Sequence, residues 1–289
     1  MTTQFKIQVR KAQKAVGRTA VYLIVVLGAI VVSIPFAWQI STSLKDIKEV
    51  FVFPPEWIPD PVVWRNYPDA WNALPFTLYL WNSAFLTFTC VLGRVASSSL
   101  IAYAFARLRA PGRDTLFLIL LSALMLPDQV TMIPLYMFFS RLNWVNTFLP
   151  LIVPQFFGGG AFNIFLLRQF YMTIPLELDE AAKIDGCGFF AIYYRLILPL
   201  SRPALAAVAI FSFMFHWQDF MGPLIYLDSQ RYTLSLGLRY FMEAAGSGGI
   251  TRWNWLMAVS VLAMIPPLTI FFVAQKYYIQ GIVMTGIKG

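Results

Sequence analysis

Long apolar runs alternate with shorter polar segments along almost the whole chain. An apolar run of about 20 residues is long enough to cross the hydrocarbon core of a bilayer as a helix. The pattern predicts six transmembrane helices, near residues 19–40, 77–104, 115–138, 147–167, 204–226 and 253–274. Because no linker-like composition separates these runs, we expect an all-α, polytopic membrane protein whose six helices form one bundle.

Two of the predicted spans contain residues that interrupt a helix. The third span has Pro127 and Pro134 around Asp128 and Gln129, and the fourth contains the run Gly158–Gly160. Irregular backbone at membrane depth is tolerated only where protein or a water-filled cavity covers it. We therefore expect both spans to face the bundle interior or a pathway, which makes Asp128 and Gln129 candidate pathway residues.

The fifth predicted span becomes polar towards one end, where it reads FHWQDF from Phe215 to Phe220. Asp219 lies about 22 Å along a helix from Ala204. An ionisable residue at this depth indicates either a functional site or a hydrogen-bonded structural pair between helices. Gln218 and Asp219 are therefore further pathway candidates. The single histidine, His216, has no Cys or His partners in the pattern, and no metal site is predicted.

Composition and charge support the membrane class. The chain has 289 residues, of which 58% are hydrophobic and only 12% are charged, outside the usual range of a soluble domain. The net charge of +8 could indicate a nucleic-acid partner, but the basic residues lie mostly between the apolar spans. Orientation in the membrane accounts for them better, so no nucleic acid is expected.

The distribution of basic residues predicts the orientation. With six spans, 14 of the 22 lysines and arginines lie on the side that holds both termini, and 7 lie on the other. The richer side of a membrane protein is cytoplasmic. We therefore expect a cytoplasmic N-terminal segment (residues 1–18), a cytoplasmic tail (residues 275–289) and cytoplasmic loops at residues 105–114 and 168–203.

Two long loops are then external. Residues 41–76 are rich in proline, tryptophan and tyrosine, which suits a loop lying near the bilayer surface. Residues 227–252 form the second loop and contain a glycine-rich segment that predicts a flexible tip. That segment consists of Gly246, Ser247, Gly248 and Gly249.

A further long interruption of the apolar pattern runs from Pro175 to Pro203 and falls on the predicted cytoplasmic side. Proline suits a first helical position, and carboxylates in the opening turns face the positive end of the helix dipole. A helix is therefore predicted from Leu176 to Asp185, and Gly186 fits the left-handed position that ends a helix. Leu198-Pro199-Leu200 and Pro203 indicate a bent entry into the next apolar segment.

Three blocks in this interruption resemble the EAA loop of permease subunits in binding-protein-dependent ABC importers. They are Glu180-Ala181-Ala182, Asp185-Gly186 and Leu196-Ile197-Leu198-Pro199. Leu196 departs conservatively from the isoleucine that is usual in the family. The resemblance implies a type I ABC importer permease fold, in which this loop forms a cytoplasmic coupling helix that docks in a cleft of the ATPase. It makes Glu180, Ala181, Ala182, Asp185 and Gly186 the expected coupling residues.

Further blocks resemble the second permease of the maltose-type, carbohydrate-uptake branch. They are Ser43 to Lys45, Pro54-Pro55, Asn66-Tyr67, Pro111-Gly112-Arg113, Asn146-Thr147, Phe165 to Phe170, Ile174-Pro175, Trp217 with Asp219-Phe220, and Lys288-Gly289. The resemblance implies an inner-membrane heterodimer with a homologous permease, two copies of an ATPase and an extracytoplasmic sugar-binding protein. It also suggests that the tip at 246–249 enters the cleft of the binding protein. The permease domain would be residues 19–274, with a core at 77–274 and the coupling loop at 175–203.

The sequence contains no GxxxxGK[ST] phosphate loop and no arrangement typical of nucleophilic catalysis. We therefore expect a non-enzymatic subunit without a cofactor of its own, which leaves ATP and Mg²⁺ to a separate ATPase. Three alternatives stay open. They are an importer permease of the same superfamily for glycerol phosphate, peptide or polyamine, a secondary transporter that uses Asp128 and Asp219, and an integral membrane enzyme. The pattern does not identify the sugar.

Overall fold

The computed structural model describes residues 2–246 and 252–286, and these residues form helices, turns and loops without a β-strand. The chain forms two compact units. Unit 1 comprises residues 1–73 and 245–262, and unit 2 comprises residues 74–244 and 263–289. The last helix, α14 (Trp253–Gly286), contributes to both units.

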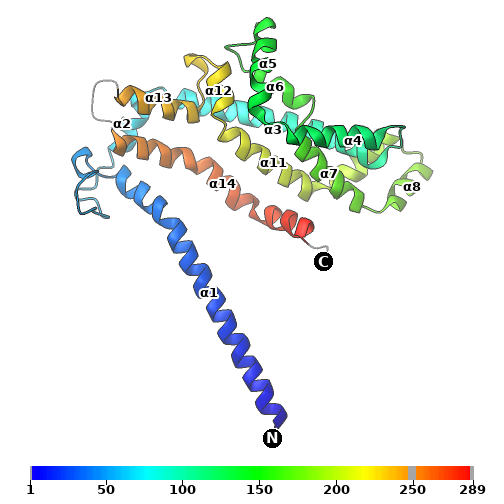
Figure 1. Cartoon of the computed structure of the whole chain (residues 1–289), viewed down its shortest axis with the longest axis horizontal. Coiled ribbons are helices and arrows are strands. Elements are labelled where there is room, and N and C mark those ends of the chain that lie inside the picture. The colour runs from blue at the N-terminus through cyan, green and yellow to red at the C-terminus, as the bar shows by residue number, and fades with distance from the viewer. Residues whose placement is uncertain (1, 247–251, 287–289) are drawn as a thin grey trace. The chain divides into compact units, whose positions relative to one another are not determined.

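Unit 1 begins with the long helix α1 (Thr2–Ser43), drawn in blue in Figure 1. Its apolar part, Gly17–Ser43, has a mean hydropathy of 2.6, and none of its most apolar 18-residue window is buried in the protein. Such a surface suits lipid. The predicted first span at residues 19–40 is therefore confirmed as a helix long and apolar enough to cross a membrane.

The predicted loop at 41–76 is folded onto the end of α1. It contains a 3₁₀ turn (Ile47–Glu49) and helix α2 (Asn66–Ala73). The buried Asn66 Nδ2 donates hydrogen bonds to the carbonyl oxygens of Ser43 (2.9 Å) and Lys45 (2.8 Å). Asn254 Nδ2, at the start of α14, donates to the same Lys45 carbonyl at 3.2 Å. The loop thereby joins the end of α1 to the starts of α2 and α14 within unit 1.

Substituting Asn66 with alanine tests this arrangement. The variant removes both hydrogen bonds, and the Lys45 carbonyl keeps only the longer bond from Asn254, so we expect a loss of about 1–3 kcal/mol of stability. The loss is expected as a lower thermal unfolding midpoint of the detergent-purified protein. Asn72→Ala, on the exposed side of the same helix, is the matched control. Equal midpoints for the two variants would show that the hydrogen bonds of Asn66 do not hold the loop.

Unit 2 is organised around the 32-residue helix α3 (Phe76–Arg107), which runs alongside three others (Figure 1). These are α6 (Leu149–Phe156), α7 (Ala161–Thr173) and α11 (Arg202–Trp217). Close packing depends on glycine at two points. A Cβ atom on Gly93 would lie 2.6 Å from the Phe156 ring, and one on Gly159 would lie 2.7 Å from the backbone nitrogen of Ser98.

The predicted third and fourth spans are interrupted, as expected. The third consists of α4 (Arg113–Ser122), a 3₁₀ turn (Ala123–Met125) and α5 (Asp128–Arg141), with a bend of 102° beside Pro127. The prediction that Pro134 also breaks this span is wrong, because Pro134 lies inside α5, which runs on to Arg141. In the fourth, residues 157–160 separate α6 from α7, where Gly159 and Gly160 have positive φ angles of 59° and 84°.

The predicted fifth span, 204–226, is wrong at one end, because α11 stops at Trp217 and a separate helix, α12 (Met221–Tyr226), follows. At the other end, the helical segment Phe189–Leu200 meets α11 at a bend of 78°, and Pro199 and Pro203 lie at this bend. The bent entry predicted there is confirmed. Four described helices are long and apolar enough to span a membrane, or up to six if each bent pair counts as one.

The remaining elements lie between the apolar spans. The predicted outer loop at 227–252 contains a 3₁₀ turn (Ser229–Arg231) and helix α13 (Leu234–Gly246). Gly246 ends this helix, and Ser247, Gly248 and Gly249 lie outside the described residues.

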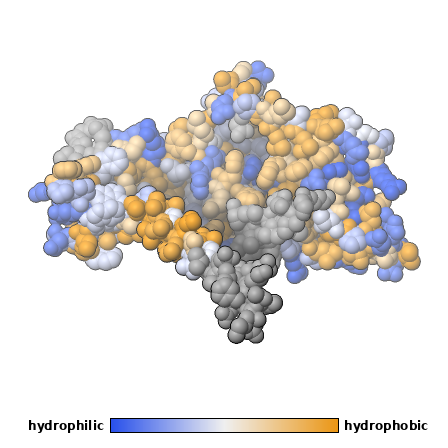
Figure 2. Space-filling model, turned by 60° about the horizontal axis from the view of Figure 1, so that its bottom comes forward, coloured by the Kyte–Doolittle hydropathy of each residue, from blue (hydrophilic) through white to orange (hydrophobic). Residues whose placement is uncertain are grey.

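The predicted sixth span is confirmed at Trp253–Gln275 within α14. Figure 2 shows apolar side chains in orange over much of the face in view, as membrane-facing helices require.

Candidate functional site

The segment predicted as a coupling helix forms the short helix α8 (Leu176–Ile184). Pro175 lies at the N-cap, one position earlier than expected, and the helix ends one residue before the predicted Asp185, which is its C-cap. Glu177 and Asp179 lie in the first turn, where carboxylates interact favourably with the helix dipole. The sequence therefore located this helix to within one residue at each end.

Two hydrogen bonds between the following loop and the last turn end α8 after Asp185. The Gly186 amide donates to the Lys183 carbonyl at 3.0 Å, and the Cys187 amide donates to the Ala182 carbonyl at 2.9 Å. This is the Schellman arrangement, which requires a left-handed residue between helix and loop. Gly186 has a φ angle of +79°, while a Cβ atom there would meet nothing within 4 Å. The backbone conformation at this position favours glycine, whereas the surrounding space would admit a larger side chain.

The outer side of α8 and the following turn expose large apolar side chains. Ile184 is 87% exposed, and Leu176, Phe189 and Phe190 are each more than half exposed. Four of the expected coupling residues, Glu180, Ala181, Asp185 and Gly186, are exposed as well, whereas Ala182 packs against the core of unit 2. A surface of this kind is typical of a docking site for another protein.

The inner side of α8 holds a charge. Asp179 Oδ2 lies 3.5 Å from Arg107 Nε at the end of α3, and the two side chains are only 8% and 3% exposed. The sequence did not indicate this pair. Its one signal was the arginine that ends an otherwise apolar run at Ala102–Arg107, before a loop.

The four pathway candidates occupy two helix boundaries of unit 2. Asp128 and Gln129 begin α5, and Gln218 and Asp219 lie in the turn between α11 and α12. Asp219 Oδ1 accepts a hydrogen bond from the Gly222 amide at 3.1 Å, and its carbonyl accepts one from Ser235 Oγ at 2.8 Å. Asp219 therefore stabilises the start of α12, a local structural role.

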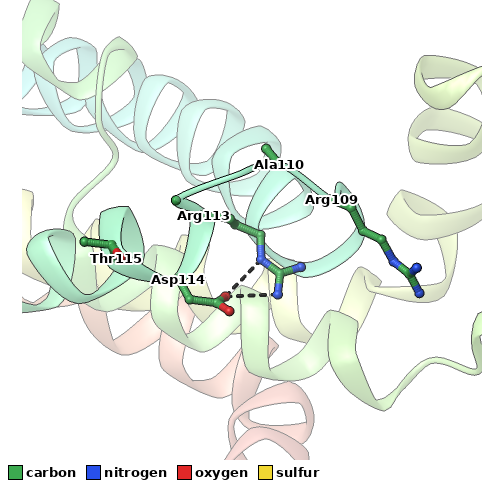
Figure 3. Close-up of a pocket in the computed structure, with 6 residues that line it drawn as sticks. Arg109, Ala110, Arg113, Asp114 and Thr115 are labelled. Atoms are coloured by element: carbon green, nitrogen blue, oxygen red, sulfur yellow. Dashed lines mark hydrogen bonds and ion pairs between the residues drawn. The ribbon is translucent and has the colours of Figure 1, made fainter.

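A pocket of about 460 Å³ lies at the loop between α3 and α4, and its walls include Arg109, Gly112 and Asp114. Figure 3 shows Arg113 turned towards Asp114, with Arg113 Nη2 2.9 Å from Asp114 Oδ1, and Arg109 extending away from this pair. The ion pair offsets the charge of Arg113 and leaves that of Arg109. Across the described residues, no three His, Cys, Asp or Glu side chains gather where they could hold a metal ion.

Residues 95–283 match the family of binding-protein-dependent transport system inner membrane components. The chain belongs to this family. The resemblance based on the EAA blocks is thereby confirmed, and the protein is a multi-pass importer permease.

Curated relatives cover nearly the whole permease. This permease is 33% identical over 269 residues to the sn-glycerol-3-phosphate transport system permease protein UgpE of Yersinia enterocolitica. The match covers 91% of this chain and 94% of the relative. It is also 31% identical over 280 residues to the probable ABC transporter permease protein YurM of Bacillus subtilis. This match covers 95% of this chain and 90% of the relative. Both relatives are permeases by name, which agrees with the family.

The solved structures show the fold. The permease superposes with a TM-score of 0.80, at 20% identity, on a chain of a bacterial ABC transporter involved in the import of the acidic polysaccharide alginate. The match covers 92% of the permease and 98% of that chain. The predicted ABC importer permease fold is thereby confirmed.

Several blocks that resembled the carbohydrate branch have structural roles in the permease. Gly112 adopts a φ angle of 76° at the N-cap of α4, and Asn146 adopts 63° while its amide donates to the Tyr226 carbonyl at 2.8 Å. Trp217 Nε1 donates to the Ala263 carbonyl at 3.3 Å. These residues shape turns and helix contacts, so they carry no direct information about the substrate.

Proposed function

We propose that this permease is one membrane subunit of an ATP-driven importer and that a separate ATPase docks on α8. The exposed apolar surface around Ile184, on a helix with a fixed C-terminal turn, carries this proposal. The chain contains no phosphate-binding loop of its own, which supports placing ATP and Mg²⁺ in the partner. In this assembly both termini and α8 are cytoplasmic, as the distribution of lysine and arginine favours.

The proposed partners follow from the family and the surface. A homologous second permease completes the pathway, two copies of the ATPase supply the energy, and an extracytoplasmic binding protein delivers the solute. The apolar part of α1, Gly17–Ser43, is proposed to contact lipid. The glycine-rich segment 246–249 is proposed to reach the binding protein.

The proposed mechanism is alternating access. ATP binding closes the ATPase dimer and displaces α8 together with the cleft that holds it. The two permeases then rock, so that their shared cavity opens outward and accepts solute from the binding protein, and hydrolysis resets the assembly. Asp128, Gln129, Gln218 and Asp219 are the candidate pathway residues, with Asp219 also stabilising the turn before α12.

The proposed substrate is a sugar, because the blocks outside the EAA loop resemble the carbohydrate branch of the family, although none of them is a known contact with the solute. The UgpE relatives favour a second candidate, sn-glycerol 3-phosphate. Calorimetric titration of the cognate binding protein with sugars and with sn-glycerol 3-phosphate distinguishes the two. Uptake is then measured in vesicles that hold the complete assembly and ATP. Ion-driven uptake by this chain alone would contradict the proposal and favour a secondary transporter.

Deleting Gly246–Gly249 tests the contact with the binding protein. We expect slower uptake of solute from the loaded binding protein, because the shortened segment no longer reaches its cleft. The amount of assembled complex is the control, since the deletion leaves α8 and its surroundings intact. Unchanged uptake per complex would remove this segment from the mechanism.

A further inference from the structure

Arg107 holds three elements of unit 2 together at one point. It is the last residue of α3, and its side chain is 3% exposed. Its Nη2 atom donates to the carbonyl oxygens of Tyr171 (2.8 Å) and Ile174 (2.7 Å), at the end of α7. A cation at these carbonyls is favourable because the C-terminal end of a helix carries partial negative charge.

The same guanidinium faces the first turn of α8. Arg107 Nε lies 3.5 Å from Asp179 Oδ2, and Asp179 is one of the few residues of α8 that point inward. Both charges are removed from water, so each depends on the other for compensation. The pair connects α8 with α3 and α7 through buried side chains, in addition to the chain itself.

Hydrogen bonds around this pair extend the connection. Tyr103 Oη, one turn before Arg107, donates to the Phe189 carbonyl at 3.0 Å, just after α8. Ser99 Oγ lies 3.0 Å from Tyr171 Oη and 2.7 Å from Tyr193 Oη, within hydrogen-bonding distance of both. One face of α3 is thus bonded to both segments that flank α8.

We propose that Arg107 and Asp179 are positioning residues that transmit the movement of α8 into α3 and α7. This inference rests on the proposed function, because it concerns how the docked helix moves the membrane part. A nine-residue helix joined to the bundle by turns could otherwise rotate in place. The buried ion pair makes α8, α3 and α7 move as one body, so ATPase closure reaches the pathway.

The test is Asp179→Asn in the full permease, assembled with its partner permease and ATPase. Asparagine keeps the shape of the side chain and removes the charge that faces Arg107. We expect uptake per assembled complex to fall by about tenfold or more. ATP hydrolysis should continue at its basal rate but lose stimulation by the loaded binding protein. Glu243→Gln is the matched control, because it removes the exposed ion pair with Arg239 on α13.

Dividing uptake by the amount of assembled complex distinguishes a loss of transmission through α8 from a loss of folding or assembly. If Asp179→Asn assembles poorly, the double variant Arg107→Met with Asp179→Leu buries no charge and restores assembly. Its uptake per complex should still be low, because neither the ion pair with Asp179 nor the carbonyl contacts of Arg107 then join α8 to α3 and α7. Wild-type uptake per complex in either variant would overturn the inference. If the unaltered permease shows no ATP-driven uptake, the proposed function fails instead.

Discussion

Replacing Gly186 with valine is expected to abolish ATP-driven uptake while leaving docking of the binding protein intact. Gly186 adopts a φ angle of +79°, which costs an L-residue about 1–2 kcal/mol and a β-branched residue more. Valine therefore breaks the turn that ends α8, and the exposed apolar surface next to it changes shape. Uptake in reconstituted vesicles and co-purification with the binding protein measure the two effects.

The neighbouring Gly188 provides the control. It has an extended backbone, with φ at −77° and ψ at 170°, and a Cβ atom there would meet nothing within 4 Å. Gly188→Val should therefore transport normally, and Gly186→Asn should keep part of the activity because asparagine tolerates the left-handed region. Similar uptake by Gly186→Val and Gly188→Val would show that the end of α8 has no role in coupling.

Replacing Ile184 with aspartate is expected to detach the ATPase. Ile184 is 87% exposed, so the variant should fold and insert normally. In the assembly the same side chain would be buried against the ATPase, where an unpaired carboxylate is strongly unfavourable. Loss of a central interface residue typically costs about 2 kcal/mol or more, which corresponds to roughly a 30-fold weaker association. Co-purification of the ATPase with the tagged permease measures the loss.

The matched control for this variant is Ile58→Asp. Ile58 is also exposed, at 81%, but it lies in the folded loop of unit 1, far along the chain from α8. The control should retain the ATPase, since the substitution is the same and only its position differs. Retention of the ATPase by Ile184→Asp would place the docking surface elsewhere.

The sequence predicted the features that depend on local chemistry. The apolar runs located the membrane helices, and Pro127 and Pro199 marked two bends that the structure contains. The carboxylates and Gly186 located α8 to within one residue at each end. Each of these signals acts over a few residues of backbone, so a single sequence is enough to interpret them.

The contacts between distant residues could not be predicted in this way. Arg107 and Asp179 are separated by four further α-helices along the chain, α4 to α7, and nothing in their spacing indicates that they meet. The end of α11 at Trp217 was missed because the apolar run continues beyond Asp219. There a polar turn, stabilised by the Gly222 amide, overrides the hydrophobic pattern.

The side of the membrane on which α8 lies is tested most directly by a cysteine at position 184. Cys90 and Cys187 are first replaced with alanine, and Ile184→Cys is then treated with a membrane-impermeant maleimide. The thiol should stay unlabelled in intact cells, react in inverted vesicles stripped of the ATPase, and be protected when the ATPase is added back. Labelling from outside intact cells, or equal labelling with and without the ATPase, would contradict coupling through α8.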